Sequence, residues 1–274
     1  MPNTLYWNSV TGDVGAAASW GGTAPADLDT MYVDGRSQKA MISGLNQTGI
    51  APTLVEFLEA YLGDVGFPSD PLKLDGSAAG KFIWRGQGKL YFEGTTTPWG
   101  RVLIDTPNTS HRIILPNQAT EIAIRRGNAH WPITHSGGPT RLFVGYAENP
   151  EFDAIVRIEN SFEGIEVYQF GGQLIYLGAT ANAPNGRHVL AGGYLQLDGL
   201  APYYVQTGGH CDFGVEKNSG ISNPLITKAI LLGGSMDATR AVLGQTITDL
   251  WISDKFELVE DSKLTVTNRY KLWE

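Results

Sequence analysis

Three acidic residues, Asp212, Asp237 and Glu257, take the same position in successive copies of a repeated segment. If these segments are neighbouring strands of one sheet, the carboxylates lie about 5 Å apart on one face. Two carboxyl groups at ~5–5.5 Å suit a retaining glycosidase, and carboxylate oxygens also bind Ca²⁺. A solvated acidic face is the alternative that we favour, because His210 and Lys255 lie close enough in the chain to offset the repulsion.

Two further pairs of residues carry reactive groups. His210 and Cys211 are adjacent, and adjacent strand residues point to opposite faces, so they do not form a catalytic dyad. His130 and His135 lie five residues apart in an expected loop, without a third metal ligand nearby in the sequence. We therefore expect no bound metal and no cofactor.

Two tryptophans lie next to prolines in segments that interrupt the strand pattern. Trp99 follows Pro98, and Trp131 precedes Pro132. Exposed rings at these places could stack on sugars, although single aromatic residues in loops more often pack locally or at subunit contacts. Trp131 is therefore a candidate for an interface with another subunit.

A segment led by two glycines recurs along the second half of the chain. Its copies read GGQLIYLG, GGYLQLDG, GGHCDFGV, GGSMDATR and, more loosely, SDKFELVE, and they begin 21, 16, 25 and 20 residues apart. The third and fifth positions after each start are apolar or aromatic, whereas the second and fourth are mostly polar. This alternation is typical of strands with one buried face. The predicted interior columns are Leu174, Leu195, Cys211, Met236 and Phe256, and Tyr176, Leu197, Phe213, Ala238 and Leu258.

A second series of strands has the same period. ITKAILL from Ile226, ITDLWIS from Ile247 and VTNRYKL from Val266 follow one another at spacings of 21 and 19 residues. A rung of about 20 residues cannot bury its apolar face alone and must stack on the next rung. An ordinary all-β domain with Gly-Gly turns is the alternative, but the shared columns favour a right-handed parallel β-solenoid.

The first 70 residues contain fewer strand patterns than the rest. TLYWN, TMYVDG and KAMISG look like strands between loops, and TLVEFLEAYLG fits both helical and alternating spacing. We favour a strand for the latter. We expect 1–70 to form a loop-rich N-terminal cap with the first strands, and 71–274 to form one continuous solenoid domain.

Composition and charge exclude several classes of protein. The 274 residues include 34 Gly and 14 Pro, which suits turn-rich β structure. The net charge of −8 comes from scattered acidic residues and leaves no basic stripe, so we expect no nucleic-acid partner. The single cysteine allows no internal disulfide. No stretch of 18 apolar residues and no signal-peptide pattern occurs, so we expect no membrane partner and synthesis in the cytoplasm.

Two segments within about the first 90 residues resemble known β-solenoid proteins. YWNSVTGDVGAAASWGGTAPADLDTMYVDG resembles the Trp-rich start, followed by a Pro and an Asp-led strand, of several such proteins, including autotransporter passengers. YLGDVGFPSDPLKLDG resembles a Tyr-x-Gly-x-x-Gly pattern followed by Pro-Leu in β-helical structural proteins of tailed bacteriophages. An autotransporter would need a secretion signal and a membrane barrel, so the phage resemblance is the stronger one.

The resemblance implies a non-enzymatic structural protein located in a bacteriophage virion and made in the host cytoplasm. We expect a capsid decoration or cement protein that stabilises the head, binds the major capsid protein or other virion subunits and forms a homo-oligomer. The alternative is a tailspike-like β-helix that binds or depolymerises a polysaccharide through Asp212, Asp237 and Glu257.

The last residues form a further predicted interface. KLTVTNRYKLWE continues the repeat and leaves an open strand edge, which invites pairing. We expect another copy, a virion subunit or the N-terminal segment to cover this edge. Its interface candidates are Tyr270, Leu272 and Trp273.

Overall fold

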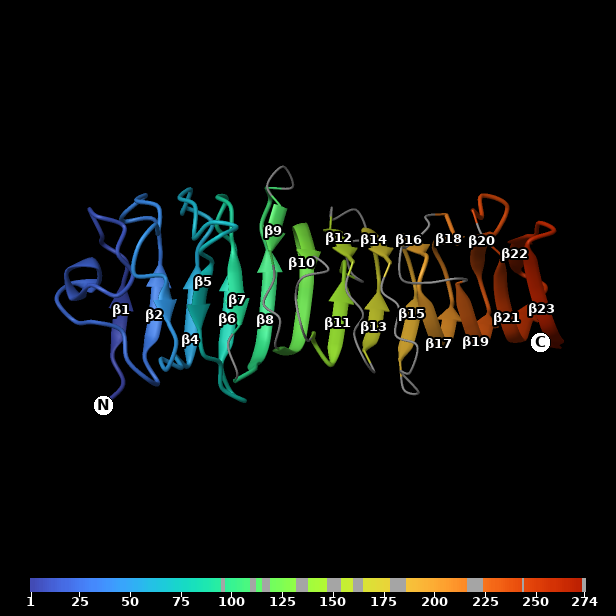
Figure 1. Ribbon diagram of the computed structural model, residues 1–274, viewed down its shortest axis with the longest axis horizontal. Coiled ribbons are helices and arrows are strands. Elements are labelled where there is room, and N and C mark those ends of the chain that lie inside the picture. The colour runs from blue at the N-terminus through green and yellow to red at the C-terminus, as the bar shows by residue number, and fades with distance from the viewer. Residues whose placement is uncertain are drawn as a thin grey trace. The chain divides into compact units, whose positions relative to one another are not determined.

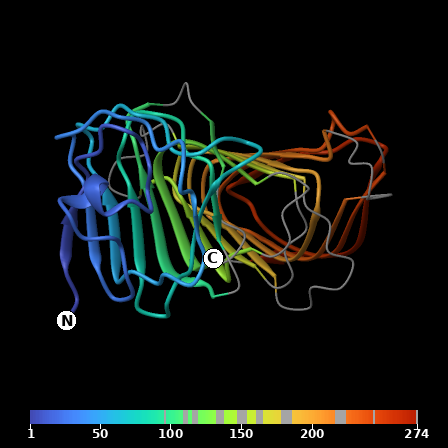
Figure 2. The same cartoon turned by 60° about the vertical axis from the view of Figure 1, so that its left-hand side comes forward.

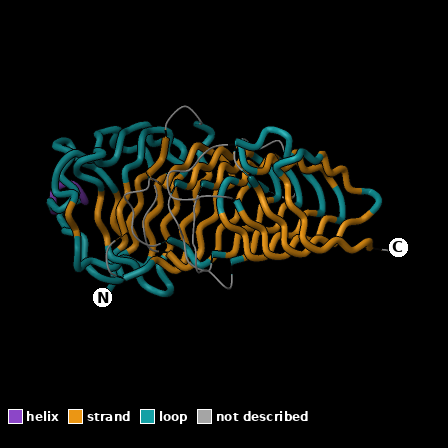
Figure 3. Tube along the Cα trace, turned by 45° about the vertical axis from the view of Figure 1, so that its right-hand side comes forward, coloured by secondary structure: helices purple, strands orange, loops and turns teal. Residues whose placement is uncertain are grey.

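The fold is all-β, with parallel strands stacked as a β-solenoid of about nine turns. The computed structural model describes residues 1–94, 97–108, 112–114, 119–131, 138–146, 154–159, 165–177, 186–215, 224–242 and 244–272. These residues belong to two compact units, Met1–His130 and Trp131–Glu274, which we describe separately. Apart from the 3-10 turn Ala17–Trp20, the described residues form strands, turns and loops (Figure 3). The predicted solenoid is confirmed.

In the first unit, successive turns of the solenoid each contribute one strand to a single parallel sheet (Figure 1). TLVEFLEAYLG contributes a strand, β4, as predicted. Because pairing starts at β1, the segment expected to be a cap supplies strands to the same ladder as the residues after it. The strands of this sheet are β1 (Thr4–Tyr6), β2 (Thr30–Val33), β4 (Leu54–Phe57), β6 (Lys81–Trp84), β8 (Trp99–Asp105) and β10 (Ala119–Trp131).

A second parallel sheet of the first unit is smaller, and its strands are β3 (Asn46–Gln47), β5 (Leu72–Leu74) and β7 (Phe92–Gly94). One more short strand, β9 (Arg112–Ile114), pairs with the end of β10.

In the second unit, odd-numbered and even-numbered strands form two separate parallel ladders (Figures 1 and 2). We call them the odd sheet and the even sheet. The odd sheet contains β11 (Arg141–Val144), β13 (Glu166–Gln169), β15 (Arg187–Leu190), β17 (Leu200–Gln206), β19 (Leu225–Leu231), β21 (Gln245–Ser253) and β23 (Leu264–Leu272). The even sheet contains β12 (Ala154–Ile158), β14 (Gln173–Tyr176), β16 (Tyr194–Leu197), β18 (His210–Phe213), β20 (Gly234–Asp237) and β22 (Phe256–Val259).

The repeated Gly-Gly pairs form the corners that lead from the odd sheet to the even sheet. The second glycine of each pair has a positive φ, for example 73° at Gly209, which side-chain-bearing residues rarely adopt. A Cβ at Gly209 would also lie only 2.6 Å from the carbonyl oxygen of Gly193 in the rung before it. The repeat therefore reflects both the conformation of the corner and the close stacking of corners.

The interior columns confirm most of the predicted register. Leu174 pairs with Leu195, Leu195 with Cys211, and Cys211 with Met236, all of them buried. The second series is confirmed as well, since Ile226 pairs with Ile247 and Ile247 with Val266 in the odd sheet.

The last rung departs from the predicted register by two residues. Met236 pairs with Leu258, and Phe256 pairs with Gly234. Two residues separate the paired positions Leu231 and Gly234, whereas the three residues 253–255 separate their partners in the next rung. The longer corner lacks the glycine pair, so it cannot make the same tight bend.

Candidate functional site

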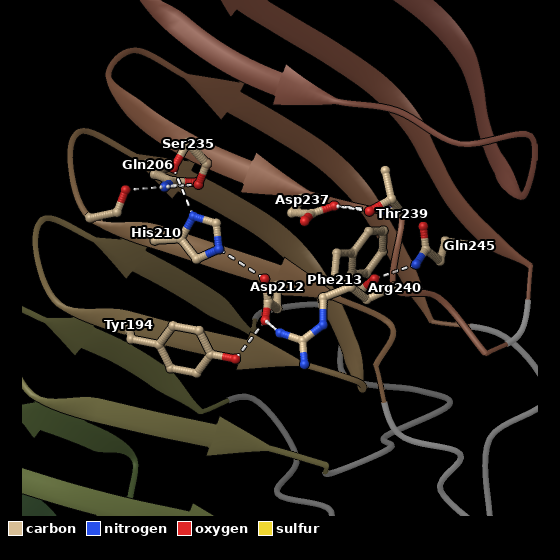
Figure 4. A network of polar contacts seen from close by, with 11 residues as sticks. Tyr194, Gln206, His210, Asp212, Phe213, Ser235, Asp237, Thr239, Arg240 and Gln245 are labelled. Carbon is tan, nitrogen blue, oxygen red and sulfur yellow. Dashed lines mark hydrogen bonds and ion pairs between the residues drawn. The ribbon is translucent and has the colours of Figure 1, made fainter.

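Asp212 lies at the centre of a polar cluster on the outer side of the even sheet. Its strand neighbours Cys211 and Phe213 are fully buried in the interior, so Asp212 projects from the opposite face. Its side chain is nevertheless only 2% exposed, because other side chains cover it (Figure 4). A carboxylate buried in this way needs partners for both oxygens.

Three side chains supply those partners. Arg240 Nη1 lies 2.6 Å from Asp212 Oδ2, and the Tyr194 hydroxyl donates to the same oxygen at 2.7 Å. His210 Nε2 lies 2.8 Å from Oδ1. Tyr194 comes from β16, His210 from β18 itself and Arg240 from the turn after β20 (Figure 4). The cluster therefore connects three successive rungs of the even sheet.

The partners of Asp212 are themselves held in place. His210 Nδ1 lies 2.8 Å from the Ser235 hydroxyl, and the His210 ring stacks on Tyr194 with 5.9 Å between ring centroids. Burial, and then the hydrogen bond to Asp212, raises the pKa of Tyr194, so this phenol keeps its proton and remains a donor. The geometry of the cluster is thus fixed by contacts on every rung.

Asp237 pairs with Asp212 in the ladder, as predicted, but it turns toward different partners. Its Oδ1 accepts hydrogen bonds from the Thr239 amide and hydroxyl, each at 2.7 Å (Figure 4). These bonds lower the pKa of Asp237. Asp237 therefore remains ionised at neutral pH and does not act as the protonated member of an acid pair.

The prediction that Glu257 continues this acidic column is wrong. Glu257 is exposed and pairs with Ser235, because the corner before β22 is one residue longer than the preceding corner, whereas the predicted register required it to be one residue shorter. Asp212 is buried against Arg240, so the charge repulsion expected along a solvent-exposed acidic column does not arise there. The cluster is an ion-pair network that ties rungs together.

The cluster resembles neither a glycosidase pair nor a cation site in its contacts. Both oxygens of Asp212 already have partners, and Arg240 supplies the positive charge that a metal ion would otherwise provide. Within the described ranges, no group of three or more His, Cys, Asp or Glu side chains is arranged to hold a metal ion.

Cys211 and His210 point to opposite faces, as predicted. Cys211 is buried inside the unit, and burial raises the pKa of its thiol to about 12, so the reactive thiolate does not form at neutral pH. Of the other histidines singled out, His130 is buried, and His135 lies outside the described residues.

The prediction that Trp99 and Trp131 are exposed is wrong. Both are fully buried, so neither ring is available to a sugar or to another subunit. Trp99 starts β8 and packs edge-on against Phe82 and Phe92 in the interior of the first unit. Trp131 ends β10 and is therefore part of a strand, where a loop was expected.

The interface candidates near the end of the chain lie on β23 or just after it. Tyr270 is 45% exposed and stacks on Trp251, with 4.8 Å between ring centroids. Leu272 is partly exposed, and Trp273 lies outside the described residues. Tyr270 thus belongs to a surface that continues from β23 onto β21.

That surface, which the sequence analysis missed, is a line of apolar side chains on the outer face of the odd sheet. Each member pairs in register with the next member and is partly or largely exposed, and every member except Tyr270 lies between buried strand neighbours or follows one. We call this line the outer column. Its residues are Phe143, Tyr168, Val189, Val205, Ile230, Trp251 and Tyr270.

No protein-family model, curated protein or solved structure matches this chain. Among the described residues, no helix has the length and apolarity needed to span a lipid bilayer. The second unit has two distinctive outer surfaces: the Asp212 cluster on the even sheet and the outer column on the odd sheet.

Proposed function

We propose that the chain is a non-enzymatic structural protein of a bacteriophage virion, a capsid decoration or cement protein that binds the major capsid protein. The virion setting rests on the resemblance of the first 90 or so residues to β-helical phage proteins. A structural role is supported by the geometry of the second unit.

The observation that carries the structural role is the closed set of contacts around Asp212. Its two oxygens are taken by Arg240, Tyr194 and His210, which come from three rungs. A catalytic carboxylate must instead reach a substrate atom or a water. The residues that could have formed an acid–base site serve to hold the solenoid rungs in register.

The decoration role is tested with particles that lack the protein. The gene is deleted from the phage, mutant heads are purified, and the recombinant chain is added before sedimentation and electron microscopy. The proposal expects the chain to sediment with heads at symmetric capsid sites and to raise the temperature at which the heads release DNA. Attachment to tails alone, or no attachment to particles, would overturn it.

The tailspike-like alternative has a separate test. The purified chain is incubated with the surface polysaccharide of the host, and new reducing ends are measured for the native protein and for Asp212→Asn and Asp237→Asn. The proposal expects no cleavage by any of the three. Cleavage by the native chain that either amide abolishes, with the variant still folded by circular dichroism, would replace the structural role by an enzymatic one.

A further inference from the structure

The outer column places apolar residues on the side of the odd sheet that faces away from the interior. Its ends are aromatic, since Phe143 stacks on Tyr168 at 5.3 Å and Trp251 stacks on Tyr270 at 4.8 Å. Its middle is aliphatic. Seven members at the ~4.8 Å spacing of paired strands give a line of about 29 Å.

The even sheet of the same unit provides an internal comparison. A sheet face exposed to water normally carries polar residues, and the outward positions of the even sheet mostly do. These positions are Arg157, Ile175, Gln196, Asp212, Asp237 and Val259. A continuous apolar line on the other sheet indicates a surface that is covered by a partner.

A line of mostly charged residues runs beside the outer column, two residues before each of its members. We call this line the charged flank, and its members also pair in register from strand to strand. In strand order it is Arg141, Glu166, Arg187, Tyr203, Lys228, Asp249 and Asn268. Its first six members therefore read positive, negative, positive, neutral, positive and negative.

This order of charges is complementary to its own reverse. Read backwards from Asp249, the same six members are negative, positive, neutral, positive, negative and positive. When the forward and backward readings are set side by side, Arg141 lies opposite Asp249, and Glu166 lies opposite Lys228. A surface that matches its own reverse fits a two-fold symmetric contact between two identical chains.

The remaining positions of this arrangement match as well. At its centre Arg187 lies opposite Tyr203, whose hydroxyl oxygen can accept a hydrogen bond from the guanidinium. Two large apolar residues, Phe170 and Leu232, lie two residues after their members of the outer column, and Leu232 is 43% exposed. They lie opposite each other in the same arrangement, so their apolar surfaces meet.

We propose that the outer column packs against the outer column of a second copy of this chain, with the two solenoids running in opposite directions and displaced by one rung. The two-fold axis lies parallel to the strands, between β15 and β17, and six rungs of each copy are in contact. Apolar members then meet apolar members, with Val189 against Val205 at the centre. Each ion pair of the charged flank occurs twice by symmetry, so four ion pairs border the apolar contact.

Two other registers of the opposite-direction arrangement bring at least six rungs together, and their charges match less well. Without displacement, Glu166 would face Asp249 and Arg187 would face Lys228. Like charges would then lie opposite each other in both pairs, which is unfavourable in an interface. A displacement of one rung in the other sense would leave Arg187 with Asp249 as its one kind of ion pair.

The same-direction arrangement lacks charge matching altogether. It would set the charged flank of each copy against the uncharged residues that lie two positions after the members of the outer column. Charged groups would then lose water without gaining an opposite charge, which is unfavourable. The displaced opposite-direction arrangement is therefore the one that the charges support.

Association and register are tested together by exchanging one ion pair in the purified full chain. Sedimentation equilibrium measures the mass of the native chain, of Lys228→Glu, of Glu166→Lys and of the variant that carries both changes. We expect the native chain to form a dimer at concentrations up to ~100 µM. Each single change sets like charges opposite each other at two symmetric places, so it should weaken association roughly tenfold, and the double variant should recover it.

The recovery would report a contact between copies. Within one chain Glu166 and Lys228 lie three strand spacings apart, ~14 Å, which exceeds the ~10 Å range of exposed charges in 0.1 M salt. Ile230→Lys and Ile175→Lys are a matched pair that tests the surface, since Ile175 is an outward residue of the even sheet. Ile230→Lys should weaken association, and Ile175→Lys should leave it unchanged.

The displacement is tested by disulfide formation between introduced cysteines. A mixture of Val189→Cys and Val205→Cys should give linked dimers under mild oxidation, and neither variant should link with itself. Without displacement Val205 would meet its own counterpart, and in the same-direction arrangement both residues would do so. The native Cys211 is buried and does not interfere.

Four outcomes would overturn the inference. A native chain that stays monomeric at ~100 µM would leave the outer column to a different partner. Equal weakening by Ile230→Lys and Ile175→Lys would place the contact elsewhere. A double variant that does not recover, or a cysteine variant that links with itself, would exclude the displaced arrangement. Because no capsid is present, each of these results is separate from the head-binding test.

Discussion

The interiors of the two units are filled by different chemistry. In the first unit, aromatic rings meet across the interior: Phe82 stacks on Phe92 at 4.2 Å, and Phe57 lies 4.7 Å from Trp84. In the second unit, smaller apolar residues such as Leu195 share the interior with buried polar side chains. Those polar side chains are Gln169, His188, Gln206 and Gln245.

The turns differ in a matching way. In the first unit, aspartates accept hydrogen bonds from backbone amides; buried Asp29 accepts from Asn3 N at 2.6 Å and from Ala26 N at 2.9 Å. In the second unit, buried glutamines also donate to backbone carbonyls at the Gly-Gly corners. Gln206 Nε2 donates to Gly209 O at 3.1 Å and to Ser235 O at 2.9 Å.

The difference shows two ways in which side chains provide hydrogen-bond partners for backbone groups at the turns of a solenoid. At a Gly-Gly corner, carbonyl oxygens such as Gly209 O accept a backbone amide from the next rung, and the second lone pair of the oxygen can take a side-chain donor. Gln169 donates to Gly172 O and Tyr194 O at an equivalent corner, so the solution recurs. In the looser turns of the first unit, aspartate side chains such as Asp29 accept hydrogen bonds from backbone amides.

The largest effect should come from the ring-filled interior. Phe82→Ala removes a ring that touches Phe57, Phe92 and Trp99, and rigid rings cannot collapse into the gap. We expect a loss of ~5 kcal/mol in the free energy of unfolding of the first unit, measured by urea titration. Phe213→Ala in the second unit should cost ~3 kcal/mol, and equal losses would contradict this view of the two interiors.

The Gly-Gly corners should be sensitive to a single methyl group. Gly209→Ala forces a Cβ into a left-handed conformation and against Gly193 O, which together should cost ~3 kcal/mol in urea unfolding. Gly21→Ala in the first unit is the control. Gly21 has a φ of 74°, but a Cβ there meets nothing within 4 Å, so we expect only ~1 kcal/mol. Similar losses would mean that close stacking of corners is unimportant.

A buried histidine should make the second unit sensitive to acid. Burial lowers the pKa of His188 to about 4. The unfolded side chain titrates near ~6.5, so between pH 6.5 and 4 the unfolded chain binds a proton that the folded chain does not. Stability should therefore fall as the pH drops through this window, by about 3 kcal/mol in total, and be unaffected above it.

The variant His188→Leu isolates this contribution. Urea unfolding of the native chain and of the variant is compared at several pH values between 4 and 8. The difference between their free energies of unfolding should change with pH only below about 6.5, in favour of the variant. A constant difference across the range would show that His188 does not titrate on unfolding.

The sequence predicted the solenoid and most of its register because alternation and the glycine period report directly on strand faces and corners. The last rung was misplaced because the length of the corner at 253–255 depends on backbone conformation, which the glycine-free segment does not reveal. Trp99 and Trp131 were misjudged because neighbouring prolines suggested loops, whereas both rings belong to strands.

The outer column and the Asp212 partners were missed for physical reasons too. In ITKAILL, the outward Ile230 lies between the buried Ala229 and Leu231, so apolar residues on both faces remove the alternation that reveals a strand. Tyr194 shares a column with His210 and could have been paired with it. Arg240 reaches Asp212 from a turn, and no periodicity predicts that reach.

The smallest predicted difference in unfolding free energy between the two units concerns Gln206, a glutamine at a Gly-Gly corner. Gln206→Leu matches its ladder neighbours Leu190 and Leu231 in type, but it removes the side-chain donor to Ser235 O and to Gly209 O. Gly209 O keeps the hydrogen bond that it accepts from Ser235 N at 3.0 Å. Each carbonyl would lose one hydrogen bond in a partly buried corner, and we expect the second unit to lose ~1 kcal/mol in urea unfolding.

The matched control is Gln38→Leu in the first unit. Gln38 Nε2 also donates to two carbonyls, those of Gly35 and Ala60, but it is exposed. Water can replace an exposed donor, so we expect a loss of no more than ~0.5 kcal/mol. If both variants lose the same amount, the buried glutamines are not needed to satisfy the Gly-Gly corners. The contrast between the two units would then rest on the packing of their interiors alone.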